Sequence, residues 1–181
     1  MNKIIAVVGM CGSGKSVAVD EFVKAGFQKI YFGQATMDVL AKRGLPKTEA
    51  NERMVREELR ATGDKGIYAK IFLPQIRELF EKGNVVIESM YSWSEYKYVK
   101  EEFGDAFEVL CIATDAEIRY KRLQTRKIRP LTKEQAMSRD WAEIENIEKG
   151  GPIGIADHYI TNNDDEQTFL NEINEYIESV K

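Results

Sequence analysis

A single eight-residue segment, Gly9 to Ser16, constrains this chain more than any other feature. It reads Gly-Met-Cys-Gly-Ser-Gly-Lys-Ser and satisfies the pattern G-x-x-x-x-G-K-S/T. The apolar run Lys3–Val8 precedes it, as expected of a buried strand, and apolar residues at helical spacing follow it between positions 17 and 23. A glycine-rich turn between a strand and a helix points backbone N–H groups at phosphate oxygens, at the positive end of the helix dipole. The segment therefore predicts a phosphate-binding loop.

The side chains of this loop predict a site for ATP with Mg²⁺. Lys15 is expected to reach the β- and γ-phosphates and to act in catalysis, and the Ser16 hydroxyl is expected to hold Mg²⁺. For Cys11, a redox role is the alternative to a tolerated small side chain. The residues of this segment predicted to contact the nucleotide are Gly9, Cys11, Gly12, Ser13, Gly14, Lys15, Ser16 and Val17.

The rest of the chain alternates between strand and helix patterns. Further strands are predicted at Phe27–Phe32, Asn84–Glu88, Phe107–Ala113 and Ile155–Thr161. Helices are predicted across 35–82, with breaks at 44–46 and 63–66, and across 166–180. Capping-box patterns at 92–95, 114–117 and 132–135 predict three more helix starts, the last helix running to about residue 149. This alternation favours a single α/β domain over residues 1–181, with five parallel strands and helices on both faces.

Composition narrows the classes of function. The chain has 181 residues with 26 Lys+Arg against 30 Asp+Glu, and its formal charge of −4 argues against general nucleic-acid binding. No apolar run reaches about 18 residues, so no membrane span is expected. Cys11 and Cys111 lack metal-site spacing and cannot make a disulfide framework. We expect a cytoplasmic protein that is a monomer or a small homo-oligomer.

Glu88 is the next candidate after the loop. It ends a predicted buried strand, at the carboxyl edge of the sheet where ligands of α/β folds bind. It could hold Mg²⁺ through water, or position an acceptor during catalysis; an ordinary strand-end acid facing solvent is the alternative. The aromatic residues at 91, 93, 96 and 98 could stack on a flat base or pack into the protein. His158, within an apolar strand pattern, is interpreted as a packed residue and not as a catalyst.

A basic cluster follows the fourth predicted strand, with no acid between residues 119 and 129. Arginines at 119, 122, 126 and 129 lie close to one helical face, and their guanidinium groups suit phosphate oxygens. Arg122 is predicted to contact the nucleotide. Arg126 and Arg129 are predicted to stabilise charge on a phosphoryl group in transit. Because Pro130 disfavours helix at Arg129, the segment 126–135 is expected to form a lid; a solvated basic surface is the alternative.

Together these features resemble the nucleoside-monophosphate-kinase-like P-loop kinases. From Arg122 onward, Arg-Leu-x-x-Arg, then Leu-Thr-Lys-Glu-Gln-Ala, Arg139-Asp140 and Ile-Ala-Asp-His-Tyr-Ile-Thr-Asn, are similar to dephospho-CoA kinases. The middle segment, Lys-Arg-Gly-Leu-x-x-Thr-x-x-Asn through Glu-Glu-Leu-Arg-Ala-Thr-Gly, resembles the archaeal adenylate-kinase-related proteins. The resemblance covers nearly the whole chain. It implies a three-layer P-loop fold with an acceptor-binding region at about 34–66 and a lid near 126–135.

The acceptor side departs from both groups. Dephospho-CoA kinases carry an aspartate just after the second strand, where this chain has Gly33-Gln34. The archaeal group has Asp-x-x-Arg after the second strand, replaced here by Gln34 and Met37. Its Asp-Gly-x-Arg after the third strand is Glu-Ser-Met-Tyr here, from Glu88 to Tyr91. Two arginine anchors for an acceptor phosphate are therefore missing. The substitutes available in the sequence are Arg53, Arg56 and Arg60.

These departures bear on the acceptor. A phosphate monoester is already an anionic nucleophile and needs no general base. The favoured prediction is therefore an ATP-dependent kinase of a small-molecule phosphate acceptor, in the nucleoside monophosphate or dephospho-CoA class. Two alternatives stay open: a kinase of small-metabolite hydroxyls, whose loop resembles that of shikimate kinases, and a non-kinase ATP-dependent switch or ATPase.

Overall fold

The computed structural model of the chain describes residues 2–61 and 63–181, and its centre is a five-stranded parallel sheet. The strands lie in the order β2-β3-β1-β4-β5. Their bounds are β1 Ile4–Val8, β2 Gln28–Tyr31, β3 Val85–Glu88, β4 Phe107–Ala113 and β5 His158–Thr161. The helices are α1 Lys15–Lys24, α2 Gln34–Lys42, α3 Glu49–Arg60, α4 Ile67–Lys82, α5 Trp93–Phe103, the 3₁₀ turn η1 Gly104–Ala106, α6 Ala116–Thr125, α7 Lys133–Ile147, α8 Gly150–Gly154 and α9 Glu166–Val180.

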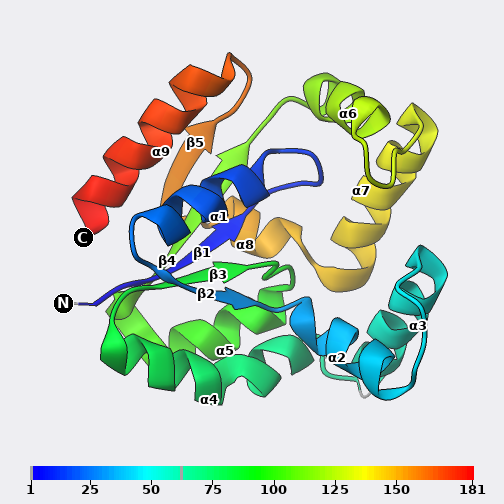
Figure 1. Ribbon diagram of the computed structural model, residues 1–181, viewed down its shortest axis with the longest axis horizontal. Helices are drawn as coiled ribbons and strands as arrows, with labels where there is room; N and C mark the ends of the chain where they lie inside the picture. Colours follow the sequence, from blue (N-terminus) through cyan, green and yellow to red (C-terminus); the bar gives the residue numbers. More distant parts are fainter. Residues whose placement is uncertain (1, 62) are drawn as a thin grey trace.

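Alternation along the strands builds a three-layer core. In β1, Ile4, Ala6 and Val8 belong to one buried cluster, which includes residues of α4 and α5. Ile5 and Val7 point the other way, into a cluster with residues of α1 and α9. Because both faces of the sheet are covered, the central strand is apolar throughout. The helices of the two clusters lie on opposite sides of the sheet (Figure 1). The predicted fold class is confirmed.

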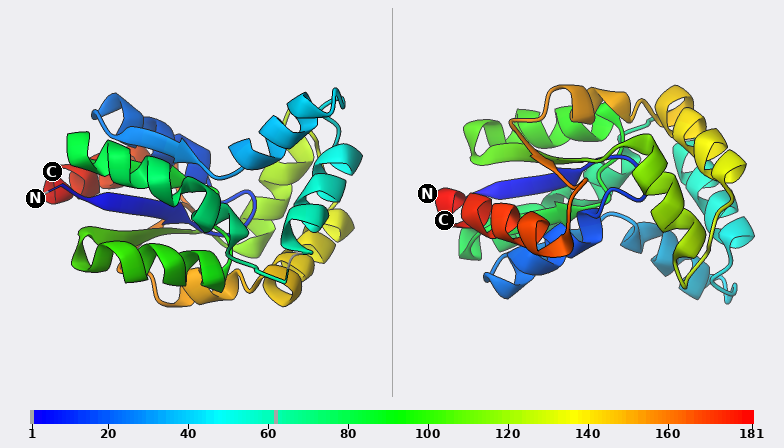
Figure 2. Two further views of the ribbon diagram at one scale, coloured as in Figure 1. Left: turned by 90° about the horizontal axis from the view of Figure 1, so that it is seen from below. Right: turned by 90° about the horizontal axis from the view of Figure 1, so that it is seen from above.

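The order of the strands places the candidate site. The strand order changes direction at β1, because β2 and β3 lie on one side of it and β4 and β5 on the other. Ligands of α/β folds bind outside the carboxyl ends of the strands at such a point. Helices α2, α3, α6 and α7 gather beyond that edge, while both chain termini lie at the other end (Figure 2). None of the described helices is both long and apolar enough to cross a membrane.

Several local predictions are confirmed and one is wrong. Capping boxes begin α5 at Ser92 and α7 at Thr132. The third predicted box is absent: α6 begins after Asp115, without a side-chain cap, because the Thr114 hydroxyl binds the phosphate loop instead. The fifth strand is shorter than predicted, beginning at His158, and the five-residue α8 precedes it.

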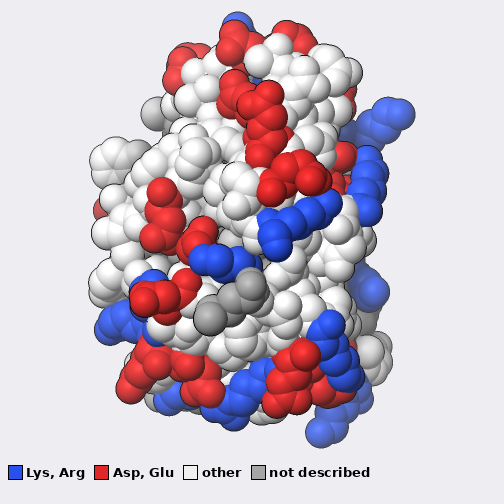
Figure 3. Space-filling model, turned by 90° about the vertical axis from the view of Figure 1, so that its left-hand side faces the viewer, with Lys and Arg blue, Asp and Glu red and all other residues white. Residues whose placement is uncertain are grey.

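The end of the molecule that holds the termini carries interspersed acidic and basic side chains (Figure 3). An open cavity of about 490 Å³ lies there, lined by residues that include Lys3, Glu108, Asp157 and His158. His158 is exposed, and its ring stacks on Tyr176 with centroids 4.8 Å apart. Because His158 is the first residue of β5, it lies at the amino edge of the sheet, remote from the phosphate loop.

Candidate active site

The glycines of the phosphate loop lie where a side chain would not fit. Gly9 has φ 141°, and a Cβ there would come within 2.4 Å of the Ile112 carbonyl oxygen. Gly14 has φ 101°, and a Cβ there would come within 2.3 Å of the Asn162 amide nitrogen. L-residues rarely adopt such φ values, whereas glycine does so readily. The loop between β1 and α1 therefore requires these glycines for its shape and for its close packing on β4 and on the loop after β5.

Side chains from the other elements hold the loop carbonyls from outside. The Ser13 carbonyl accepts hydrogen bonds from the Thr114 hydroxyl, at 3.1 Å, and from the Asn162 amide, at 2.9 Å. The Cys11 carbonyl accepts one from Arg119, at 3.0 Å. Because these hydrogen bonds hold the carbonyl groups on the outside of the loop, the loop has its shape before any ligand binds. Ser13 contributes through its backbone, because its own Oγ is buried without a hydrogen-bond partner among the described residues.

Arg119 is a structural residue, not a free cation of the basic cluster. It is nearly buried, and its guanidinium forms a bidentate pair with Asp140 of α7, at 2.8 and 3.2 Å. Tyr120 donates a further hydrogen bond to Asp140, at 3.1 Å. The prediction of four arginines on one helical face is corrected here, because α6 ends at Thr125 and Arg119 points into the protein.

Lys15 begins α1 and folds back over the loop. Its Nζ donates a 2.8 Å hydrogen bond to the Met10 carbonyl. Burial, together with the nearby charge of Lys149, lowers the pKa of Lys15 to about 7. A phosphate group bound in the loop would place a negative charge beside this ammonium group and would raise its pKa again.

Ser16 and Glu88 lie together, as a shared magnesium site requires. The Ser16 hydroxyl donates to a Glu88 carboxylate oxygen at 3.2 Å, and the other carboxylate oxygen pairs with Lys29 at 2.6 Å. Glu88 reaches this position because β3 pairs directly with β1, with Val7 opposite Glu88. A hydroxyl and a carboxylate fit Mg²⁺, which binds proteins through few oxygen ligands and completes its shell with water and phosphate.

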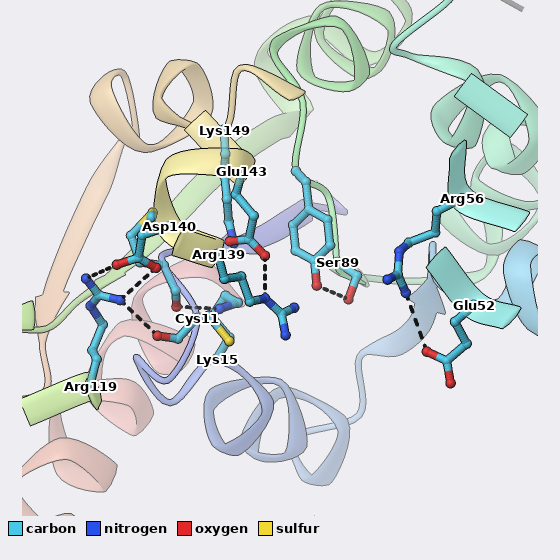
Figure 4. Close-up of polar contacts among 12 residues, drawn as sticks. Cys11, Lys15, Glu52, Arg56, Ser89, Arg119, Arg139, Asp140, Glu143 and Lys149 are labelled. Carbon is cyan, nitrogen blue, oxygen red and sulfur yellow. Dashed lines mark hydrogen bonds and ion pairs between the residues drawn. The ribbon is translucent and has the colours of Figure 1, made fainter. Parts of the chain in front are cut away.

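A second group of charged side chains approaches the loop from α7 and the segment after it (Figure 4). Glu143 accepts from Arg139 at 3.0 Å and from the buried Lys149 at 2.5 Å. Burial alone would raise the pKa of Glu143, but Lys149 and Arg139 lower it to about 2. Arg139 lies beside Cys11 and Lys15, so a fixed cation faces the loop from the side opposite α1.

The remaining predicted arginines divide into two groups. Arg122 donates to Asn162 at 3.3 Å, and so lies beside the loop that Asn162 braces. Arg126 donates to the Arg129 carbonyl, and Arg129 forms a bidentate ion pair with Glu52 of α3. The segment predicted as a lid is thus attached to the predicted acceptor region.

One face of α3 carries Glu52, Arg56 and Arg60, spaced one turn apart. Arg56 approaches Glu52 at 3.5 Å, and both lie across the site from Lys15 (Figure 4). The Arg60 guanidinium lies 5.0 Å from the centre of the Tyr68 ring, and its Nε has no hydrogen-bond partner among the described residues. Arg53 is exposed and pairs with Glu57, so it does not share this face. Of the three proposed substitutes, Arg56 is therefore the one shown across the site from Lys15.

Comparison with known proteins agrees with this geometry. The model of a family described as an AAA domain matches residues 5–150. A UPF0200 protein of Thermococcus onnurineus is 32% identical to this chain over 181 residues, and the match covers 98% of this chain and 97% of the relative. The chain belongs to the UPF0200 family.

Solved kinases share the fold of this UPF0200 protein. Dephospho-CoA kinase from Campylobacter jejuni has a TM-score of 0.57 and 21% identity, covering 99% of this chain and 98% of its own. Shikimate kinase from Bacteroides thetaiotaomicron has a TM-score of 0.60 and 13% identity, covering 98% of each chain. At these identities the likeness shows the fold alone. The resemblance to P-loop kinases is confirmed at that level.

Sequence reasoning missed Arg139, Glu143 and Lys149 as site residues of this UPF0200 protein. The one available signal was the i,i+4 spacing of Arg139 and Glu143 on a helix just after the predicted lid. The aromatic residues after β3 mostly pack: Trp93 stacks on Tyr96 with ring centroids 4.9 Å apart. Two of them lie under lysines: the Lys149 ammonium is 4.5 Å from the centre of the Tyr91 ring, and the Lys70 ammonium is 4.6 Å from that of Tyr98.

Proposed function

We propose that this UPF0200 protein is a kinase that transfers the γ-phosphoryl group of Mg·ATP to a phosphate-bearing nucleotide or nucleotide-like acceptor. The observation that carries the proposal is the pair of cationic groups that face each other beyond the carboxyl edge of the sheet. Lys15 and Arg139 lie on the loop side, and Arg56 lies across the site on α3, with Arg60 one turn further along that helix. Two facing sets of cations suit two phosphate groups brought together for transfer.

Donor binding relies on the braced loop. Its backbone N–H groups and the α1 N-terminus would hold the β- and γ-phosphates, and Lys15 would move from the Met10 carbonyl to a phosphate oxygen. Ser16 and Glu88 would hold Mg²⁺, which neutralises charge on the phosphates when bound. Arg139, already fixed by Glu143, would stabilise the charge that develops on the transferred group.

The transfer itself needs positioning more than proton chemistry. An anionic oxygen of the acceptor phosphate forms the new bond to the γ-phosphorus, while the bond to the bridging oxygen breaks and that oxygen leaves on ADP. A hydroxyl acceptor would instead need a base for its proton. Glu88 is poorly suited to that role, because it already binds Ser16 and Lys29. The geometry therefore supports the phosphate acceptor over the hydroxyl acceptor.

The test is an ADP-release assay with Mg·ATP. The panel contains AMP, GMP, CMP and UMP for the phosphate class, and dephospho-CoA, which offers a ribose hydroxyl, with shikimate and gluconate for the hydroxyl class. Acceptor-stimulated ADP release from a phosphate acceptor supports the proposal. Lys15→Ala should abolish that stimulation. Lys24→Ala is the matched control, because Lys24 lies on the same helix, is 71% exposed and pairs only weakly with Glu21.

The same assay addresses the switch alternative, which one contact favours. Arg129 of the lid binds Glu52 of α3, so the lid is attached to that helix. ATP binding without stimulation by any acceptor would contradict the kinase proposal and support an ATP-dependent switch or ATPase. Stimulation by dephospho-CoA, shikimate or gluconate alone would contradict the phosphate acceptor while keeping the kinase.

A further inference from the structure

Ser89 has an unfavourable backbone conformation at the edge of the candidate site. It directly follows the last residue of β3 and has φ 69°. Among the described residues, three that are not glycine have positive φ, namely Ser89, Arg129 and Glu148. Glycine would adopt this conformation without strain. The chain therefore has a serine side chain at a position where the backbone conformation favours glycine.

The Ser89 hydroxyl has a specific partner. Its Oγ lies 3.1 Å from the phenol oxygen of Tyr91, two residues along the chain. The backbone of Tyr91 is fixed in turn, because its N–H donates a 2.6 Å hydrogen bond to the buried carboxylate of Glu95. The Lys149 ammonium lies over the Tyr91 ring, 4.5 Å from its centre. The two hydroxyls are therefore held as a pair by contacts that do not depend on a ligand.

The pair lies between the two cationic groups. In Figure 4, Ser89 is placed between Lys15 and Arg139 on one side and Arg56 and Glu52 on the other. The Tyr91 phenol is close enough to Arg139 and Cys11 for their charges to influence its pKa, which burial raises. The phenol therefore stays protonated at neutral pH and can donate a hydrogen bond. Two hydroxyls that share one mutual hydrogen bond retain one O–H group for a third oxygen atom.

We propose that the Ser89–Tyr91 hydroxyl pair binds the phosphate group of the acceptor and holds it in line with the phosphoryl donor. This inference rests on the proposed kinase function and deepens it by naming residues that position the acceptor. Ser89 lies between Arg56 and the loop-side cations Lys15 and Arg139, so an acceptor phosphate held near Arg56 would approach the donor beside Ser89. An O–H donor there would orient the attacking oxygen between the two cationic groups.

Two substitutions at Ser89 separate strain from function. Ser89→Gly removes the hydroxyl and relieves the backbone, whereas Ser89→Ala removes the hydroxyl and keeps the positive φ. Tyr91→Phe removes the partner hydroxyl alone. The measurements are the thermal unfolding midpoint, and kcat and KM for Mg·ATP and for the fastest nucleoside monophosphate among AMP, GMP, CMP and UMP.

We expect Ser89→Gly to raise the midpoint by about 2 °C and Ser89→Ala to leave it unchanged or lower it. Both should lower kcat/KM for the monophosphate at least about tenfold, the loss of one hydrogen bond to a charged oxygen, with KM for Mg·ATP unchanged. Tyr91→Phe should lower kcat/KM by a smaller factor in the same direction.

Wild-type kinetics in Ser89→Gly would overturn the inference while leaving the kinase intact, and the strain would then have no role in acceptor binding. A parallel rise in KM for Mg·ATP and for the monophosphate would also overturn it, because that pattern indicates a general disturbance of the site. No turnover of any monophosphate by the wild-type protein would contradict the proposed function itself, and this inference with it.

Discussion

The two sides of the candidate site are built in different ways. The phosphate loop is braced by Thr114, Asn162 and the buried Arg119–Asp140 pair, which come from separate elements. The lid and α3 are joined by the ion pair of Glu52 with Arg129, whose side chain is 46% exposed. A buried, fully bonded network has one arrangement, whereas a half-exposed ion pair adds little stability and exchanges partners easily. The side proposed to bind the nucleotide is thus held more firmly than the side proposed to bind the acceptor.

Removing Asp140 should have the largest effect, because it breaks the brace. The Arg119 and Asp140 side chains are 7% and 8% exposed. Asp140→Ala leaves a buried guanidinium without its counter-ion, which should lower the free energy of unfolding by about 3–5 kcal/mol. Urea unfolding followed by circular dichroism measures this loss.

The matched control is Glu117→Ala on α6. It removes the pair with Lys133, whose side chains are 65% and 45% exposed, and should cost at most about 1 kcal/mol. Equal losses of unfolding free energy in the two variants would mean that the buried Arg119–Asp140 pair stabilises the protein no more than an exposed pair does.

Arg139 and Arg129 offer a direct kinetic comparison of the two sides. Arg139 already faces the loop, so Arg139→Ala should lower kcat about 10²–10³-fold. Arg129 must first leave Glu52, and Arg129→Ala should lower kcat only about tenfold. Both should change KM for ATP less than kcat, since these charges act on the transition state. A larger effect at Arg129 would reverse the assignment and make the lid the main source of transition-state charge.

The pKa of Lys15 predicts how ATP affinity varies with pH. Without nucleotide this pKa is about 7, so the side chain becomes neutral as the pH rises above 7. Binding an anionic phosphate then requires uptake of a proton, and the Kd of Mg·ATP should rise by up to about tenfold per pH unit between pH 7 and 9. Calorimetric titration in two buffers measures both the Kd and the proton uptake. In Lys15→Arg, which stays charged, the profile should be flatter; an equally flat wild-type profile would contradict the low pKa.

The phosphate loop and the sheet could be predicted because their determinants are local. Gly9 and Gly14 are required by backbone conformation, and the apolar strands by burial on both faces. Ser16 and Glu88 meet because parallel strands bring their carboxyl ends to one edge. None of these features depends on a partner far along the chain whose identity must be guessed.

The arginines show where such reasoning ends. Spacing places Arg119 and Arg122 on neighbouring turns, but only the docking of α7, 21 residues on at Asp140, makes Arg119 a buried brace. Thr114 fits a capping pattern, yet its hydroxyl binds the Ser13 carbonyl, a tertiary contact that outweighs a local cap. Glycine and proline at the start of α8 likewise gave no local signal for a helix. Which ion pair each arginine forms is decided by tertiary packing.

Glu52 provides the finest test of the contrast between the two sides. Its carboxylate is 3% exposed and binds Arg129 across 77 residues of sequence. Glu52→Gln keeps the shape but removes the charge, which should lower the free energy of unfolding by about 1 kcal/mol, since Arg129 is half exposed. It should also speed amide hydrogen exchange across residues 126–131, because the lid loses its attachment to α3. Glu57→Gln on the outer face of α3, whose pair with Arg53 is 65% and 73% exposed, should change neither quantity. If exchange in the lid stays slow in Glu52→Gln, the lid is held by its own backbone, and the acceptor side is as rigid as the phosphate loop.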